Sequence, residues 1–171
     1  MVGAPDYFDR DQAGQVNITV TPRHPGSALK PFTYALALEQ GDTPASIAWD
    51  VLDVPSAYRP ANADGRQHGP VRYRSALASS YNLAAVHVAE RIGTGRLLAR
   101  LREAGLTTLG QPADAYGPAL TLGSGATRLI ELAAAYTFLV NGGEKVSPWF
   151  FERYVPPSGA PVLFPPPPRH R

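Results

Sequence analysis

Pro25-Gly26-Ser27-Ala28-Leu29-Lys30-Pro31-Phe32 is the stretch in which a turn becomes the first confident helix of the chain. Apolar residues recur at helical spacing from here to Gly41, and Pro31 is acceptable because it falls in the opening turn. Ser27 and Lys30 lie three residues apart, so a helix that begins at the serine brings both side chains to one face. The stretch therefore predicts a helix that carries a serine and a lysine side by side.

Ser27 and Lys30 have two interpretations. A serine hydroxyl is a poor nucleophile unless a base takes its proton, and a lysine is a base only when burial or a nearby cation lowers its pKa. The helix N-terminus would also favour negative charge developing on Ser27. The alternative is an N-capping serine beside a surface lysine, since the two residue types are common.

A second short motif, Ser79-Ser80-Tyr81-Asn82, lies between two predicted helices. The hydroxyl of Ser80 and the amide of Asn82 fall on one side of a short connection. Both residue types are also preferred at helix N-termini, so a simple cap is the competing interpretation. Together, Ser-x-x-Lys followed by Ser-x-Asn is the order found in serine enzymes that react with penicillin.

Hydrophobic periodicity predicts a mainly helical chain. We expect helices over 74–79, over 85–92 ending at Gly93, over 97–104 with Thr94 as cap, and over 127–140 with its apolar positions in the core. Residues 16–20 are β-branched and predict a strand, whereas residues 50–70, rich in Pro, Gly, Asn and Asp, predict a long surface loop. A short extended segment is expected over 149–155, before prolines end regular structure.

Composition excludes several classes of protein. The 171 residues are 44% hydrophobic and 18% charged, which suits one ordinary domain or a piece of a larger one. The longest apolar stretch, residues 129–140, is too short to cross a bilayer, and no signal peptide is visible. A net charge of +2 comes from scattered arginines and does not suggest nucleic-acid binding.

The side chains that are present exclude several kinds of functional site. The chain has no cysteine, which excludes disulfides, thiolate nucleophiles and Cys-based zinc sites. His68 and His87 have no carboxylates at a recognisable metal-ligand spacing, so we expect them to be solvated or at the edge of the core. No metal or cofactor is expected.

The chain resembles the transpeptidase domain of class A penicillin-binding proteins. The resemblance covers residues 1 to about 155 and is far more specific than Ser-x-x-Lys alone, because many short stretches match in order and spacing. Besides the first stretch quoted above, these are Met1-Val2-Gly3, Asp6-Tyr7, Gly14–Asn17, Tyr34–Leu38, Thr43–Ser46, Tyr58–Gly65, His68–Val71, Ala76–Val86, Leu122–Thr127, Glu131–Tyr136 and Asn141–Gly143.

The resemblance implies a fold and a division of the chain. The fold class is α/β and α-rich, that of serine DD-peptidases and β-lactamases. Residues 1–155 would form part of a penicillin-binding transpeptidase domain, and residues 156–171 a Pro-rich tail or linker.

The resemblance also implies a reaction on peptidoglycan stem peptides in bacterial cell-wall synthesis. Ser27 would attack the D-Ala-D-Ala carbonyl with Lys30 as its base, Ser80 would relay a proton with Lys30, and Asn82 would hold the backbone of the bound substrate. The Ser27 N–H would supply half of an oxyanion hole. A β-lactam would leave Ser27 trapped as an ester. The full-length protein would act in the periplasm, at the outer face of the inner membrane, which it would reach only through an N-terminal anchor.

One family motif is missing. Neither Lys-Thr-Gly nor Lys-Ser-Gly occurs, because Lys145 is followed by Val146 and Ser147. In the family this motif supplies a cation for the substrate carboxylate, and its strand gives the second oxyanion donor. The sequence therefore predicts a fragment that lacks the C-terminal sheet strands. A non-catalytic remnant that binds cell-wall peptide or a partner is the alternative, and an unrelated extracellular helical module is another.

Overall fold

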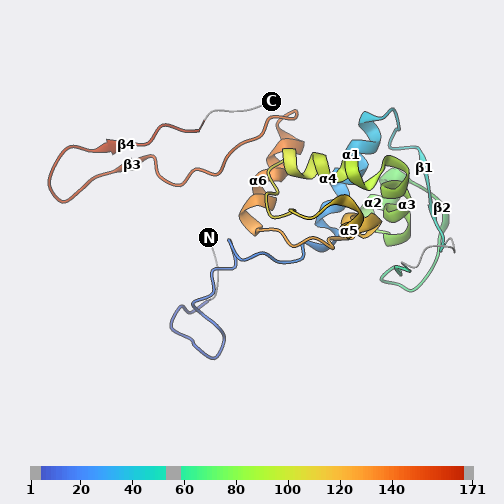
Figure 1. The fold of residues 1–171 in the computed structure, drawn as a ribbon, viewed down its shortest axis with the longest axis horizontal. Helices are drawn as coiled ribbons and strands as arrows, with labels where there is room; N and C mark the ends of the chain where they lie inside the picture. Colours follow the sequence, from blue (N-terminus) through green and yellow to red (C-terminus); the bar gives the residue numbers. More distant parts are fainter. Residues whose placement is uncertain (1–4, 53–58, 168–171) are drawn as a thin grey trace.

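A computed structural model describes residues 5–52 and 59–167 of the chain (Figure 1). The expectations that involve Met1-Val2-Gly3, Tyr58 and the tail from Pro168 to Arg171 lie outside the described residues.

The described part of the chain is α-rich with few, short strands. Its helices are the 3₁₀ helix η1 (Gly26–Leu29), α1 (Lys30–Glu39), α2 (Tyr73–Ala78), α3 (Asn82–Ile92), α4 (Thr94–Glu103), α5 (Ala113–Tyr116), the 3₁₀ helix η2 (Gly117–Leu122) and α6 (Leu129–Val140). The strands are β1 (Ile47–Asp50), β2 (Gly69–Arg72), β3 (Arg153–Tyr154) and β4 (Val162–Leu163). None of the helices in the described ranges is long and apolar enough to span a membrane.

Helix α3 packs against α1, α4, β1 and η2, and Figure 1 shows it beside β1, at the end of the helical body opposite α6. One face of α3 consists of small residues that are fully buried, Ala84, Ala85, Val88 and Ala89. Small side chains let neighbouring elements approach closely. Leu29, Phe32, Leu97 and Leu101 from η1, α1 and α4 complete the core around them. The Ser80–Asn82 motif, whose last residue begins α3, is thereby held next to the start of α1.

The predicted helices are confirmed apart from details at their ends. Ser27 does not begin an α-helix but lies in η1, one 3₁₀ turn before α1. Thr94 is not a cap: Gly93, with φ +90°, occupies the C-cap of α3 and the N-cap of α4 at once, and no side chain caps α4. Glycine adopts this backbone geometry without strain, and it lets the two helices follow each other directly.

Residues 50–70 are not simply a surface loop. Strands β1 and β2 pair antiparallel, from Ile47 opposite Arg72 to Asp50 opposite Gly69, and enclose the segment. Asp50 and Asn62 are 0% and 5% exposed. The strands escape prediction because they are four residues long and one of them contains Pro70.

The strand predicted over residues 16–20 is wrong. The Asn17 carbonyl accepts hydrogen bonds from the N–H groups of Val20 and Thr21, and the Asn17 side chain accepts one from the Thr19 N–H. The asparagine thus closes a turn with its own side chain, which outweighs the β-propensity of its neighbours.

The apolar positions of α6 are not all in the core. Leu132 and Leu139 are partly buried against the core, and Ala135 is buried, but Leu129 is 51% and Val140 78% exposed. Most residues of helix α6 are apolar, and only some of them are buried by the helical body. Strands β3 and β4 pair in a hairpin that Figure 1 shows extending away from the helical body.

Candidate active site

Ser27 lies at the exposed surface, in the 3₁₀ turn that leads into α1. Its carbonyl oxygen accepts a hydrogen bond from the N–H of Lys30, which closes the turn. Among the described residues, neither the N–H nor the hydroxyl of Ser27 donates a hydrogen bond. Both groups are therefore available to a bound molecule. Ser27 does not act as an N-cap, because no side-chain hydrogen bond caps η1 or α1.

Lys30 is buried, with 1% of the residue exposed, which excludes the surface-lysine interpretation. Its ammonium group donates to three oxygens of the second motif. These are the carbonyl of Ser80 at 2.6 Å, the hydroxyl of Ser80 at 3.0 Å and the side-chain oxygen of Asn82 at 2.6 Å. The structure thus brings Lys30 together with residues 50 and 52 positions later in the chain.

The environment of Lys30 shifts its acid–base equilibrium towards the neutral form. Burial lowers the pKa of Lys30 from 10.5 to about 8, and the negative charge of Asp50 opposes this shift in part. With a pKa of about 8, roughly a tenth of the Lys30 side chains are neutral at pH 7. A group with a pKa this close to neutrality can both accept and return a proton.

Ser80 occupies a strained turn between α2 and α3. Its φ of +55° lies in the left-handed region, which is uncommon for a residue with a side chain. The backbone N–H of Ser80 donates to the carbonyl of Leu77, and its carbonyl accepts from Lys30. The turn directs both oxygens of Ser80 at the same ammonium group. Strain of this kind persists only where surrounding contacts hold it, and it is common at functional sites.

Asn82, the first residue of α3, is held at both ends of its side-chain amide. The oxygen accepts from Lys30, and the nitrogen donates to the carbonyl of Ala61 at 2.6 Å. A ligand that used the Asn82 amide would share it with these two groups or displace one of them. No side chain of the preceding residues caps α3, so neither Ser80 nor Asn82 has the capping role considered above.

Sequence reasoning missed the buried residues behind the motif. Asp50, at the end of β1, accepts hydrogen bonds from the Asn62 side chain at 2.7 Å and from the Ala84 N–H at 3.1 Å. Asn62 in turn accepts from the Asn82 N–H at 2.6 Å. Asn62 belongs to the Tyr58–Gly65 stretch, one of those on which the resemblance depends. Its membership of that stretch is the one signal in the sequence that could have pointed to it.

His68 lies at the edge of the core, which is one of the two placements expected for it. It is half-buried, and its Nδ1 lies 2.6 Å from Asp50 while its Nε2 lies 3.1 Å from Asp64. Its ring stacks on Tyr81, the middle residue of Ser-Tyr-Asn, with ring centres 4.0 Å apart. No group of three or more His, Asp or Glu side chains within residues 5–52 and 59–167 is arranged to bind a metal ion.

Gly123 packs against Gly26, the residue before Ser27. It has φ +84° and is buried against Gly26, so that a Cβ placed on it would lie 2.3 Å from the Gly26 nitrogen. The Gly123 carbonyl lies 3.0 Å from His24 Nδ1, and the Tyr136 hydroxyl donates to the carbonyl of Ala28 at 2.8 Å. Contacts from η2 and α6 thus fix the backbone on either side of Ser27.

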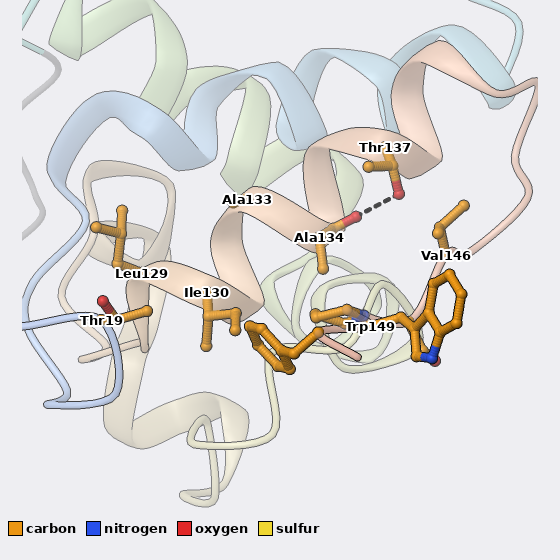
Figure 2. A pocket seen from close by; sticks show the side chains of 11 residues that line it. Thr19, Leu129, Ile130, Ala133, Ala134, Thr137, Val146 and Trp149 are labelled. Carbon is orange, nitrogen blue, oxygen red and sulfur yellow. Dashed lines mark hydrogen bonds between the residues drawn. The ribbon is translucent and has the colours of Figure 1, made fainter. Parts of the chain in front are cut away.

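A separate apolar groove lies along α6 (Figure 2). It encloses about 600 Å³ between α6, Thr19 and the segment around Trp149 and Phe150. Small residues of the helix, Ala133 and Ala134, form its floor, and the Thr137 hydroxyl donates to the Ala134 carbonyl beside it. None of the four residues of the predicted site lines this groove.

Comparisons with known proteins agree with the resemblance. The family model for the penicillin binding protein transpeptidase domain matches residues 1–163. Penicillin-binding protein 1C of Escherichia coli is 41% identical over 144 residues, which are 84% of this chain and 19% of that protein. Penicillin-binding protein 2D of Bacillus subtilis is 32% identical over 182 aligned positions, which cover all of this chain and 25% of that protein. The chain therefore spans a quarter or less of the length of these relatives.

Solved structures show the same fold. Penicillin-binding protein 1A of Haemophilus influenzae superposes with a TM-score of 0.74 at 29% identity, over 91% of this chain and 24% of that one. Penicillin-binding protein A of Mycobacterium tuberculosis, in an imipenem acyl-enzyme complex, gives a TM-score of 0.78 at 21% identity, over 95% of this chain and 42% of that one. At that identity the second likeness concerns the fold alone.

Proposed function

Because this chain belongs to the family of penicillin-binding protein transpeptidase domains, we propose that it carries the acylation site of a serine DD-transpeptidase of cell-wall synthesis. Ser27 is the nucleophile, Lys30 its general base, Ser80 the proton relay, and Asn82 a ligand of the substrate backbone. The substrates are peptidoglycan stems that end in D-Ala-D-Ala, and β-lactams are inhibitors that acylate the same serine. No cofactor enters this mechanism.

The proposed reaction has two acyl transfers. The Ser27 oxygen bonds to the carbonyl carbon of the penultimate D-Ala while its proton passes to neutral Lys30. The peptide bond to the terminal D-Ala then breaks, and its nitrogen takes a proton from Lys30 through Ser80. An amine of a second stem attacks the resulting ester, which forms the cross-link and returns the proton to Ser27.

The observation that carries this proposal is the buried ammonium of Lys30, three residues after Ser27, which donates to Ser80 and Asn82. Lys30 is in place to exchange a proton with Ser80, to which it already donates. The Ser27 hydroxyl is not hydrogen-bonded to Lys30, and in ligand-free enzymes such contacts often form only when substrate binds. The free N–H of Ser27 is available to stabilise an oxyanion.

Covalent labelling tests the proposal directly. The purified chain, incubated with penicillin G, is expected to gain the mass of one β-lactam molecule in intact-mass spectrometry. Ser27→Ala is expected to gain none while keeping the circular dichroism spectrum of the parent chain. An adduct that persists in Ser27→Ala, or a well-folded parent chain that never forms one, would contradict the assignment.

The acylation rate is expected to depend on pH through Lys30. Its neutral form is the base, and burial lowers its pKa to about 8. The rate should therefore rise about tenfold per pH unit below this value and level off above it. Quenched time courses of penicillin labelling from pH 5.5 to 9.5, within the range where circular dichroism is constant, measure how the acylation rate depends on pH. A rate that does not change between pH 6 and 8 would exclude Lys30 as the base.

A second candidate function rests on the missing third motif. No Lys-Thr-Gly or Lys-Ser-Gly occurs among these 171 residues, which by themselves hold neither the cation nor the second oxyanion donor of the family. A chain that binds cell-wall peptide without turnover would keep the helical body and bind a D-Ala-D-Ala peptide. It would form no adduct with penicillin, so the labelling experiment separates the two functions.

The rest of the family's organisation is part of the proposal. Residues 1–155 form the transpeptidase portion, beside sheet strands that this sequence does not contain, and residues 156–171 form a Pro-rich tail. The complete protein acts at the outer face of the inner membrane, in the periplasm.

A further inference from the structure

The segment 59–70 contacts the last two residues of the Ser-Tyr-Asn motif, Tyr81 and Asn82. Asn62 accepts from the Asn82 N–H, the Ala61 carbonyl accepts from the Asn82 side chain, and His68 stacks on Tyr81. Ala61, Asn62 and His68 have no part in the proposed acyl transfer.

The first turn of α3 has its backbone N–H groups satisfied from this segment and β1. Asn62 accepts from the N–H of Asn82 at 2.6 Å and of Leu83 at 3.4 Å, and Asp50 accepts from the N–H of Ala84 at 3.1 Å. A helix normally satisfies these donors with a side chain just before its start. Here the acceptors come from residues 20 to 34 positions earlier, so the cap itself fixes where α3 begins relative to β1.

Asp50 is a buried carboxylate with a complete set of donors. It is 0% exposed and accepts from the Asn62 side chain, the Ala84 N–H, and the backbone and ring nitrogens of His68. A buried charge with so many partners is rigid, because any shift leaves a charged oxygen without a donor. Asn62 links this fixed charge to Asn82, since its nitrogen donates to Asp50 and its oxygen accepts from Asn82.

We propose that Asn62 is a positioning residue, which transmits the fixed geometry of the buried Asp50 carboxylate to Asn82 and so holds the Asn82 side chain against Lys30. Asn62 touches neither Lys30 nor Ser27 and takes no part in bond making. Asp50 anchors it, and His68 orients Asp50. That the contact matters for acylation rests on the function proposed above, but the contact between Asn82 and Lys30 can be tested without any reaction.

The two lysines of the chain make a direct test possible. With ¹³C-labelled lysine, the Cε resonances of Lys30 and Lys145 are titrated by NMR, and Lys145→Arg assigns them. In Asn62→Ala the ammonium of Lys30 loses a fixed acceptor, so its titration midpoint is expected to move downward. Asn62 is uncharged, so such a shift reports geometry and not a lost charge. Asn17→Ala removes an asparagine whose hydrogen bonds among the described residues are all to the neighbouring residues 19–21, so it is expected to leave the midpoint unchanged.

Two acid-to-amide variants provide a second, matched comparison. Asp50→Asn keeps the shape of the side chain but removes the negative charge that favours protonated Lys30, so the midpoint is expected to fall. Asp64→Asn is the control, because Asp64 contacts the other nitrogen of the same histidine but neither Asn62 nor Asn82. Should Asn62→Ala fail to fold, Asn62→Gln, which keeps the amide but changes the spacing between Asp50 and Asn82, replaces it in the same titration, while Asp50→Asn measures the effect of the lost charge alone.

The expected result is a lowered midpoint in Asn62→Ala and Asp50→Asn and an unchanged one in both controls. Penicillin acylation is expected to fall about 10–100-fold in Asn62→Ala, the cost of a misplaced catalytic group. A folded Asn62→Ala protein with the parental Lys30 titration would overturn the inference. If the parent chain forms no penicillin adduct, the proposed function fails, but the titration still decides whether Asn62 positions the site.

Discussion

Gly123→Ala is expected to slow the labelling of Ser27 by penicillin on the order of 100-fold. Gly123 has φ +84°, and an added Cβ would lie 2.3 Å from the nitrogen and 2.6 Å from the Cα of Gly26. These are backbone atoms of the residue next to the nucleophile, so the turn that carries Ser27 must move. A displacement of about 1 Å at a reacting group typically costs on the order of 100-fold in rate. Labelling with a fluorescent penicillin, followed over time, measures the loss.

Gly142→Ala is the matched control. Gly142 also has a positive φ, +63°, but nothing lies within 4 Å of its added Cβ. Both variants therefore carry the cost of a left-handed alanine, on the order of 1 kcal/mol, and only Gly123→Ala adds the clash. Thermal unfolding should show Gly142→Ala slightly destabilised with its labelling rate kept. Equal labelling rates in the two variants would mean that the Gly123–Gly26 contact does not position Ser27.

Lys30→Met is expected to lower the acylation rate by about 10²–10⁴-fold, the usual contribution of a general base. Methionine matches the length of the lysine chain and suits a buried site, but it can neither accept the Ser27 proton nor donate to Ser80 and Asn82. Lys145→Met is the control, because Lys145 lies outside the site. Time-resolved intact-mass measurements give both rates, and near-parental acylation in Lys30→Met would remove the lysine from the mechanism.

Lys30→Met also tests how the buried charge of Lys30 affects the free energy of unfolding. Its folded-state pKa of about 8 lies below the ordinary 10.5 because burial disfavours the ammonium form. Below pH 8 both folded and unfolded chains hold the proton, and the full cost of burying the charge is present. Between about pH 8 and 10.5 the unfolded chain binds more protons, so the parent chain is stabilised by rising pH. Lys30→Met should lack this rise in urea unfolding measured across the interval.

Local pattern was enough to predict most of the helices. Helical periodicity depends only on residues that are close in the sequence. Helices α1, α3 and α4 are confirmed, and each has a buried apolar stripe. Pattern failed where a side chain competes with the backbone, as Asn17 does in its turn. It failed again for α6, where apolar residues were assigned to a core that covers only part of the helix.

The sequence by itself determined the family, the helical architecture and the identity of the four residues proposed to act on substrate, because ordered motifs survive as short local strings. Only the tertiary structure decided that Lys30 is buried and that its ammonium faces Ser80 and Asn82. It also revealed the Asp50–Asn62 pair behind them. These depend on the packing of α1, α3 and β1 against one another. Burial and long-range hydrogen bonds arise when distant segments exclude water together, and no local spacing encodes that.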